Sequence, residues 1–84
     1  MKLEIAEMIE EKAGFIRGLE ELLRQDKRSG VDSLAYKVEL HDDKTGDCYD
    51  EFIDIIYITG DYRRLLVTGN SNGANLMQIA KEVY

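Results

Sequence analysis

The chain has 84 residues, with 17 acidic and 11 basic side chains and a formal net charge of -6. A domain of this length buries only roughly 60 to 65% of the surface that its unfolded chain exposes. We therefore expect residues 1–84 to form a single domain without an elaborate enclosed active site. The apolar share of 44% and the charged share of 33% are typical of a globular protein rather than a disordered or membrane one. The acidic balance argues against direct binding of nucleic acid, because affinity for phosphates comes largely from Lys and Arg.

The expected location is a reducing cytoplasm. The lone Cys48 cannot form an internal disulfide, whereas small secreted domains usually contain several. Glu4 and Glu7 interrupt the start of the chain, where a secretory signal would be continuously apolar. No run approaches the ~18 apolar residues that a membrane span needs.

Residues 3–28 are predicted to form an amphipathic helix that ends near Ser29 and Gly30. At ~100° per residue, its apolar side chains fall on one broad face. Lys12 projects from the middle of that face, and Gly14 and Gly18 each cost about 1 kcal/mol relative to Ala inside a helix. The alternative to a continuous helix is a bend or break near Gly14. The predicted core face consists of Ile5, Met8, Ile9, Phe15, Ile16, Leu19, Leu22 and Leu23.

Three β-strands are predicted after this helix. Residues 33–41 alternate between apolar and polar side chains, residues 42–47 have the acids and glycine of a hairpin connection, and residues 48–58 form a second β-rich run. Asp54 sets the phase of the second strand, since the opposite phase would bury this carboxylate unpaired. A third strand covers residues 62–68. The predicted core-facing residues are Leu34, Tyr36, Val38, Leu40, Ile53, Ile55, Tyr57, Leu65 and Val67.

A final helix is predicted from about Ala74 to Tyr84, with Leu76, Ile79, Ala80 and Val83 buried. The order of elements is then α-β-β-β-α, and sequential strands usually pair with their neighbours. We therefore predict the α+β class, with a three-stranded antiparallel meander and both helices packed on one face.

The segment Gly69-Asn70-Ser71-Asn72-Gly73 matches the G-x-S-x-G pattern that holds a serine nucleophile in hydrolases. That chemistry needs a base and an orienting acid on a fold of roughly twice this length, and the one imidazole, His41, lies at the far end of another strand. We therefore expect a helix-capping turn, in which Asn70, Ser71 or Asn72 caps the final helix. No catalytic residue is assigned.

Neither a metal nor a cofactor is expected. The acids Asp42, Asp43, Asp47, Asp50 and Glu51 leave a weak cation site as an alternative, but Lys44 breaks the spacing of a calcium loop. His41 and Cys48 face each other across the predicted hairpin, and zinc usually takes three or four ligands.

The sheet face opposite the helices is a candidate binding patch. The strand phases place Phe52, Ile56 and Leu66 there with a charged rim, and an apolar centre within a polar rim is typical of interfaces. The alternative is that a bulge places Phe52 under the helices. The predicted rim consists of Lys37, Glu39, Asp50, Asp54 and Arg64.

The predicted first helix also suggests a homodimer. A helix of 26 residues extends about 39 Å, whereas strands of eight residues extend about 26 Å. The helix would then overhang the sheet and leave Ile5, Met8 and Ile9 for a second copy of the chain to cover.

The element order and size resemble the double-stranded RNA-binding domain. The RNA contacts of that domain use a lysine-rich start to the last helix, and residues 70–75 contain no basic side chain here. The resemblance therefore implies the architecture and not the binding of RNA.

The segments Ile55-Ile56-Tyr57-Ile58-Thr59-Gly60-Asp61-Tyr62-Arg63-Arg64 and Val67-Thr68-Gly69-Asn70-Ser71 are similar to the C-terminal half of small proteins encoded by bacterial prophages. Acidic helix-plus-sheet members of this group include anti-CRISPR inhibitors of Cas9, which place carboxylates where the nuclease expects DNA phosphates. This resemblance implies a bacterial host and a protein partner.

Residues 39–54 carry seven acidic side chains and one basic one, so the whole net charge of -6 resides in this segment. We expect this acidic hairpin to bind a basic site on a protein partner without catalysis, with Tyr49 and Phe52 supplying contact area and the carboxylates capturing Arg and Lys. The alternative is a small oligomeric structural or accessory phage protein, in which the acids only maintain solubility. The carboxylates expected to steer the partner are Asp42, Asp43, Asp47, Asp50, Glu51 and Asp54.

Overall fold

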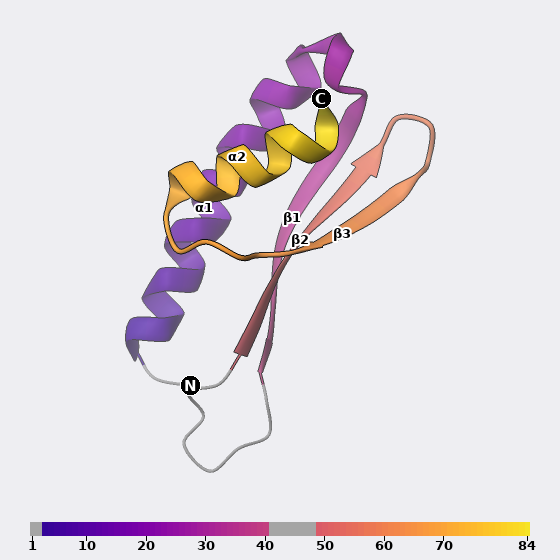
Figure 1. The fold of residues 1–84 in the computed structure, drawn as a ribbon. Coiled ribbons are helices and arrows are strands. Elements are labelled where there is room, and N and C mark those ends of the chain that lie inside the picture. Colours follow the sequence, from indigo (N-terminus) through magenta and orange to yellow (C-terminus); the bar gives the residue numbers. More distant parts are fainter. Residues whose placement is uncertain (1–2, 41–48) are drawn as a thin grey trace.

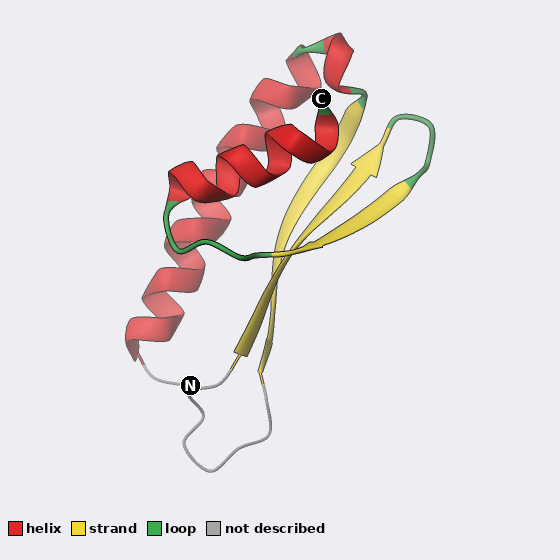
Figure 2. Cartoon of the chain, in the orientation of Figure 1, coloured by secondary structure: helices red, strands yellow, loops and turns green. Residues whose placement is uncertain are grey.

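The computed structural model describes residues 3–40 and 49–84, without the side chain of Ile5. The order is helix α1 (Leu3–Gln25), 3-10 helix η1 (Lys27–Ser29), strand β1 (Val31–Leu40), strand β2 (Tyr49–Tyr57), strand β3 (Tyr62–Leu66) and helix α2 (Asn72–Val83). The strands form one antiparallel sheet in the order β1-β2-β3. Figure 1 shows both helices on one side of this twisted sheet, and Figure 2 marks the loops between the elements. The predicted α+β fold, α-β-β-β-α, is confirmed.

Helix α1 is continuous through Gly14 and Gly18, so the alternative of a break near Gly14 is wrong. The helix ends three residues before the predicted boundary, because Asp26 caps the following 3-10 turn by accepting a hydrogen bond from the backbone N–H of Arg28 at 3.1 Å. Gly30 then reverses the chain into β1 at φ 68°, a left-handed conformation that glycine adopts without strain.

The predicted overhang of the first helix is not observed. Strand β1 has 10 residues because it begins at Val31 rather than Ser33, so it extends about 33 Å. Helix α1 has 23 residues and extends about 35 Å. The helix and its strand therefore match in length, and the argument for a dimer through Ile5, Met8 and Ile9 loses its premise.

The core lies between the helices and the sheet. Each of α1, β1, β2 and α2 contributes at least one fully buried aliphatic side chain, and Leu65 and Val67 pack against this cluster. The buried core consists of Ile16, Leu19, Leu23, Val31, Leu34, Ile53, Ile55 and Ile79. The predicted strand phases are thereby confirmed for Leu34, Ile53 and Ile55.

Three leucines predicted for the core are exposed, namely Leu22, Leu40 and Leu76. Leu22 directly precedes the buried Leu23, and Leu76 directly follows the buried Asn75. Adjacent residues of a helix are about 100° apart around its axis. Because Leu23 and Asn75 point into the core, Leu22 and Leu76 point towards solvent. Leu40 lies at the last described residue of β1, beyond the cover of the core.

Helix α2 begins at Asn72, two residues before the predicted start. Ser71 is its N-cap, and its side-chain oxygen accepts a hydrogen bond from the backbone N–H of Ala74 at 3.0 Å. The expected capping turn is therefore confirmed. A side chain at Gly69 would clash, since an added Cβ would lie 2.5 Å from the Cβ of Ala74.

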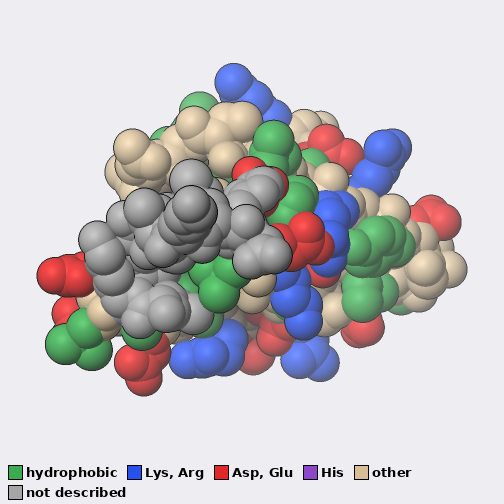
Figure 3. Space-filling model, turned by 90° about the horizontal axis from the view of Figure 1, so that it is seen from below, with side chains coloured by type: hydrophobic (Ala, Val, Ile, Leu, Met, Phe, Trp, Pro, Cys, Tyr) green, Lys and Arg blue, Asp and Glu red, His purple; other side chains and the backbone are tan. Residues whose placement is uncertain are grey.

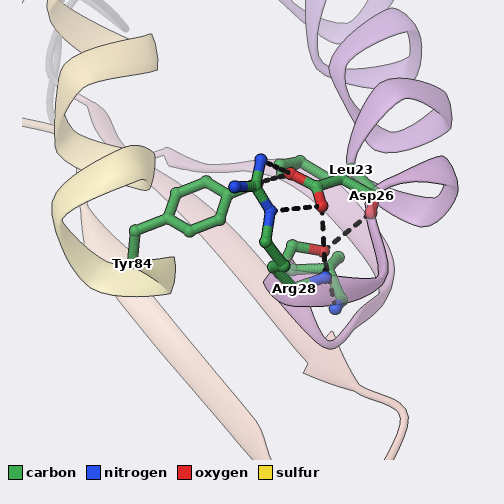
Figure 4. A network of polar contacts seen from close by, with 6 residues as sticks. Leu23, Asp26, Arg28 and Tyr84 are labelled. Atoms are coloured by element: carbon green, nitrogen blue, oxygen red, sulfur yellow. Dashed lines mark hydrogen bonds and ion pairs between the residues drawn. The ribbon is translucent and has the colours of Figure 1, made fainter.

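The end of α2 is tied to the end of α1 (Figure 4). The hydroxyl of Tyr84 donates to Oδ2 of Asp26 at 2.5 Å, and Nε of Arg28 donates to Oδ1 of the same carboxylate at 3.2 Å. These hydrogen bonds lower the pKa of Asp26 from 3.8 to about 2.

Candidate protein-binding site

The sheet face away from the helices, here called the open face, is covered by no described element. Phe52 on this face lies opposite Leu66 of β3 and Lys37 of β1. The alternative that Phe52 lies under the helices is wrong, because the guanidinium carbon of Arg64 sits 4.7 Å from its ring centroid on the open side. Ile56, Tyr62 and Leu66 are 40%, 54% and 52% exposed. The open face therefore has a partly exposed apolar centre, as predicted.

Asp54 is the most buried polar group of the open face, with 8% exposure. Arg64 binds it with two hydrogen bonds, Nε to Oδ1 at 2.8 Å and Nη2 to Oδ2 at 3.1 Å. The hydroxyl of Tyr62 donates to the same Oδ1 at 3.0 Å. Hydrogen bonds from Arg64 hold the pKa of Asp54 below its usual value, although burial acts in the opposite direction. The predicted phase is correct, but the carboxylate is neutralised within the chain.

Arg64 is the centre of this arrangement. Besides Asp54 and the ring of Phe52, its Nη1 donates to Oε1 of Glu39 at 3.1 Å. The pKa of Arg64 is raised above its usual value, chiefly by the hydrogen bonds to Asp54. A two-pronged ion pair and a ring contact fix the guanidinium in place, so the centre of the open face is ordered before any partner arrives.

Glu51 lies on the opposite side of the sheet, facing α1. Nζ of Lys12 donates to its Oε1 at 2.7 Å, and both side chains are largely buried. The hydroxyl of Tyr36 donates to the same oxygen. Burial and this hydrogen bond raise the pKa of Tyr36. The Lys12 that interrupts the predicted apolar face of α1 is therefore the partner of Glu51.

The predicted binding residues are thus divided between two faces. Asp50, Phe52 and Asp54 belong to the open face, whereas Glu51 and Tyr49 face α1, and the hydroxyl of Tyr49 donates to Sδ of Met8 at 3.4 Å. Asp50 and Glu51 do not share a face, which argues against the alternative of a cation site containing both. Asp42, Asp43 and Asp47, with His41 and Cys48, lie outside the described residues.

Three of the described acids of the hairpin contact basic side chains from neighbouring elements. Glu39 and Asp54 contact Arg64, and Glu51 contacts Lys12. Seen from the end where β1 finishes and β2 begins, blue and red side chains are interspersed, with hydrophobic side chains exposed among them (Figure 3). The described surface is therefore mixed in charge.

Arg64 was predicted only for the rim of the patch, and Tyr62 was not predicted to be part of it. Asp54 could have indicated these partners, since a carboxylate in the middle of a strand needs a hydrogen-bond donor from a neighbouring strand. Lys12 on the apolar face of α1 likewise indicated that an acidic partner lies in the sheet. In neither case could the partner be chosen before the register of the strands was known.

Within residues 3–40 and 49–84, no three His, Cys, Asp or Glu side chains are grouped to hold a metal ion. The hydroxyl of Ser71 is engaged in capping α2. None of the helices in the described ranges is long and apolar enough to cross a membrane.

Comparison of the chain with protein-family models, with curated proteins and with solved structures finds no significant match.

Proposed function

We propose that this chain is a non-enzymatic interaction protein of phage or mobile-element type that acts in the cytoplasm of a bacterial host cell. It binds a basic site on a protein partner through the acidic hairpin, residues 39–54, and the adjoining open face. The observation that supports this proposal most strongly is the open face itself. Exposed apolar side chains surround a fixed arginine there, next to the segment that carries the net charge.

The two parts of the surface have different roles in this proposal. Phe52, Ile56 and Leu66 supply apolar contact area, and full burial of an aliphatic side chain contributes roughly 1.5 to 3 kcal/mol. Asp42, Asp43 and Asp47 supply long-range attraction, because charges at the edge of an interface act mainly on the rate of association. Glu51 has no direct role in binding, since it faces α1.

The partner's basic site is one that otherwise binds nucleic-acid phosphates, as it is for the anti-CRISPR members of the prophage-encoded group to which residues 55–64 and 67–71 are similar. Carboxylates accept charge-assisted hydrogen bonds from Arg and Lys as phosphates do. DNA or RNA should then compete with this chain for the partner, and added salt should weaken the complex steeply.

The test begins with capture of the partner from the native host on immobilised protein, followed by mass spectrometry. The affinity of the purified partner is then measured for a variant with Asn at positions 42, 43 and 47. A matched control removes three acids elsewhere, with Glu4→Gln, Glu7→Gln and Asp32→Asn. We expect about tenfold or greater loss for the hairpin variant at low salt and little change for the control. Equal affinities of the two variants would show that only bulk charge matters and would contradict the proposal.

The apolar part of the surface is tested separately. Leu66→Gln is expected to weaken partner binding, whereas Leu3→Gln, which alters an exposed leucine at the start of α1, is not. Undiminished affinity of Leu66→Gln would remove the open face from the proposal while leaving the hairpin.

The alternative function is a small oligomeric structural or accessory phage protein. Exposed leucines on the helical side, Leu22 and Leu76, favour it. It predicts stability that rises with protein concentration and little response of assembly to neutralisation of the hairpin.

A further inference from the structure

The two edges of the sheet differ in how far the helices cover them. At the edge formed by β3, Nε2 of Gln78 in α2 donates to the C=O of Leu66 at 2.6 Å, and the N–H of Thr68 donates to Oε1 of Gln78 at 3.3 Å. The edge formed by β1 is covered in this way at Leu34, whose N–H donates to Oε2 of Glu20 in α1 at 2.8 Å. Backbone groups left unpaired along an edge strand are a template for another strand.

The contact at Leu34 shows which backbone groups of β1 point outward. Successive residues of an antiparallel strand point their N–H and C=O groups in alternate directions, so Tyr36, Val38 and Leu40 share the outward direction of Leu34. The pairing with β2 agrees, because Val38 lies opposite Glu51, whose C=O bonds the segment that follows β3. In the described part of the chain, no group bonds the outward N–H and C=O of Tyr36, Val38 and Leu40.

Helix α1 leaves this second half of β1 uncovered. Glu20 contacts β1, whereas Lys12 contacts Glu51 and Met8 contacts Tyr49, both in β2. The helix therefore passes from the edge strand towards the central strand. If two copies joined through β1, their β2 strands would lie three strand spacings apart, or about 14 Å. This exceeds the roughly 8 to 10 Å between packed helices, so the first halves of both α1 helices would have room.

A second copy of β1 matches this edge when the two strands run antiparallel about a two-fold axis at Val38. Each Val38 then lies opposite the other, and Tyr36 of each copy lies opposite Leu40 of the other, as an interface about a two-fold axis requires. Apolar cross-strand pairs stabilise a sheet, and this alignment covers Leu40, which is 50% exposed in the single chain. An axis at Tyr36 would instead need the N–H of Leu34, which already bonds α1.

The same alignment pairs opposite charges on the open face. Lys37 lies opposite Glu39 of the second copy, and the two-fold axis repeats this pair. Both side chains are exposed, and that of Glu39 stays 60% exposed while it bonds Arg64. An axis at Lys37 or at Glu39 would place like charges directly opposite each other, which destabilises a strand pair. The charges of β1 therefore favour the axis at Val38 and a second copy of the chain as its occupant.

We propose that the outer edge of β1 is the interface of a homodimer, in which two three-stranded sheets join into one continuous antiparallel sheet about a two-fold axis at Val38. Opposite residues of paired strands share a face, so the helices of both copies lie on one side and the two open faces lie together on the other. The proposal does not depend on what the open face binds, because it is tested on the isolated chain.

The oligomeric state is measured by sedimentation equilibrium over the micromolar range. The wild type is expected to approach twice the monomer mass of 9.6 kDa. Val38→Pro removes the N–H at the axis without removing a hydrogen bond within the chain, and it is expected to raise the dissociation constant about tenfold or more. Val38→Ala, which also shortens the side chain but keeps the N–H, is the matched control and should still dimerise. A dimer that survives Val38→Pro, with both variants folded by circular dichroism, would overturn the proposal.

The charge pairs are tested by mixing two variants, which also serves if Val38→Pro does not fold. Lys37→Glu places acids opposite acids in its own dimer, and Glu39→Lys places bases opposite bases, so each alone should dissociate about fivefold more readily than the wild type. An equimolar mixture should form the heterodimer, because acids then face bases at both pairs. Native mass spectrometry measures the three dimers. A heterodimer no more abundant than chance pairing would contradict the alignment at Val38.

Amide hydrogen exchange distinguishes a second copy from another occupant of this edge. The N–H of Val38 should exchange more slowly as the protein concentration rises, whereas that of Leu34, which bonds Glu20, should be protected at every concentration. A wild type that stays monomeric over the micromolar range would overturn the proposal. Protection of Val38 that appears only on addition of the captured partner would also overturn it, since a strand of the partner would then occupy the edge.

Discussion

The two faces of the sheet each hold a carboxylate of β2 close to a basic side chain, but they use it differently. On the helix side, Glu51 binds Lys12 from a helix 39 residues away in sequence, and both side chains are largely buried. On the open face, Asp54 binds Arg64 from the adjacent strand, and the guanidinium remains partly exposed. The first pair joins α1 to the sheet, whereas the second organises a surface that a partner can reach.

The two pairs should therefore differ in how much stability is lost when the basic partner is removed. A buried ion pair is weak evidence of net stability, but removal of one partner leaves the other charge buried and uncompensated. On the open face the base is the exposed partner, since the side chain of Arg64 is 38% exposed, and its removal would let water reach Asp54. Loss of one base should therefore destabilise the helix side far more than the open face.

The largest effect is expected for Lys12→Met, which leaves Glu51 buried without its cation. We expect the free energy of unfolding to fall by about 3 kcal/mol, measured by urea denaturation. The double variant Lys12→Met, Glu51→Gln should be less destabilised than Lys12→Met alone, because no uncompensated charge remains. A loss below about 1 kcal/mol in the single variant would place this pair on a par with surface pairs and remove the contrast.

Asp54→Asn is expected to cost about 2 kcal/mol, because the two-pronged acceptor of Arg64 is replaced by a neutral amide. The positive charge of Arg64, no longer compensated by Asp54, should also repel a basic partner, so affinity for the partner should fall together with stability. Arg64→Lys is the informative companion, since a lysine keeps the charge but cannot make the paired hydrogen bonds. If Arg64→Lys is as stable as the wild type, the paired hydrogen bonds of the guanidinium contribute little to stability beyond its charge.

Removal of one hydroxyl on each face gives a matched comparison. Tyr36 donates to the buried Glu51, and the more exposed Tyr62 donates to Asp54. We expect Tyr36→Phe to cost about 2 kcal/mol and Tyr62→Phe about 0.5 kcal/mol, because Tyr62 is 54% exposed, so water can take the place of its hydroxyl, and Arg64 still donates two hydrogen bonds to Asp54. Equal losses would mean that the two faces are equally solvated.

The smallest expected effect is on the stability of the protein at acidic pH. Asp26, which joins the ends of α1 and α2, has its pKa lowered from 3.8 to about 2. A lowered pKa in the folded state contributes stability above pH 3.8, and this contribution is lost as the pH falls towards 2. Asp26→Asn should therefore show a shallower loss of stability than the wild type between these two values. Identical acid profiles would indicate that this carboxylate is not held in the folded state.

The periodicity of the sequence was sufficient for the fold and for the two faces of the sheet. Alternation placed Ile53 and Ile55 towards the helices and Phe52 and Asp54 away from them, and the structure confirms this. These properties depend on local spacing, which a single strand determines by itself.

What the sequence did not predict depends on contacts between distant elements. The partners of Lys12 and Asp54 follow from the rotation of α1 and the register of β3, and the exposure of Leu22 and Leu76 follows from how each helix turns about its axis. The predicted overhang was wrong because two additional residues at the start of β1 lengthened the strand and α1 ended earlier. The role of Asp42, Asp43 and Asp47 stays a prediction.

The central claim is that the partner binds the open face and not the helical side with its exposed Leu22 and Leu76. It is tested most directly by the methyl resonances of labelled protein during titration with the captured partner. We expect the methyl signals of Ile56 and Leu66 to shift or broaden, while those of Leu22 and Leu76 stay unchanged. Changes confined to Leu22 and Leu76 would contradict the claim.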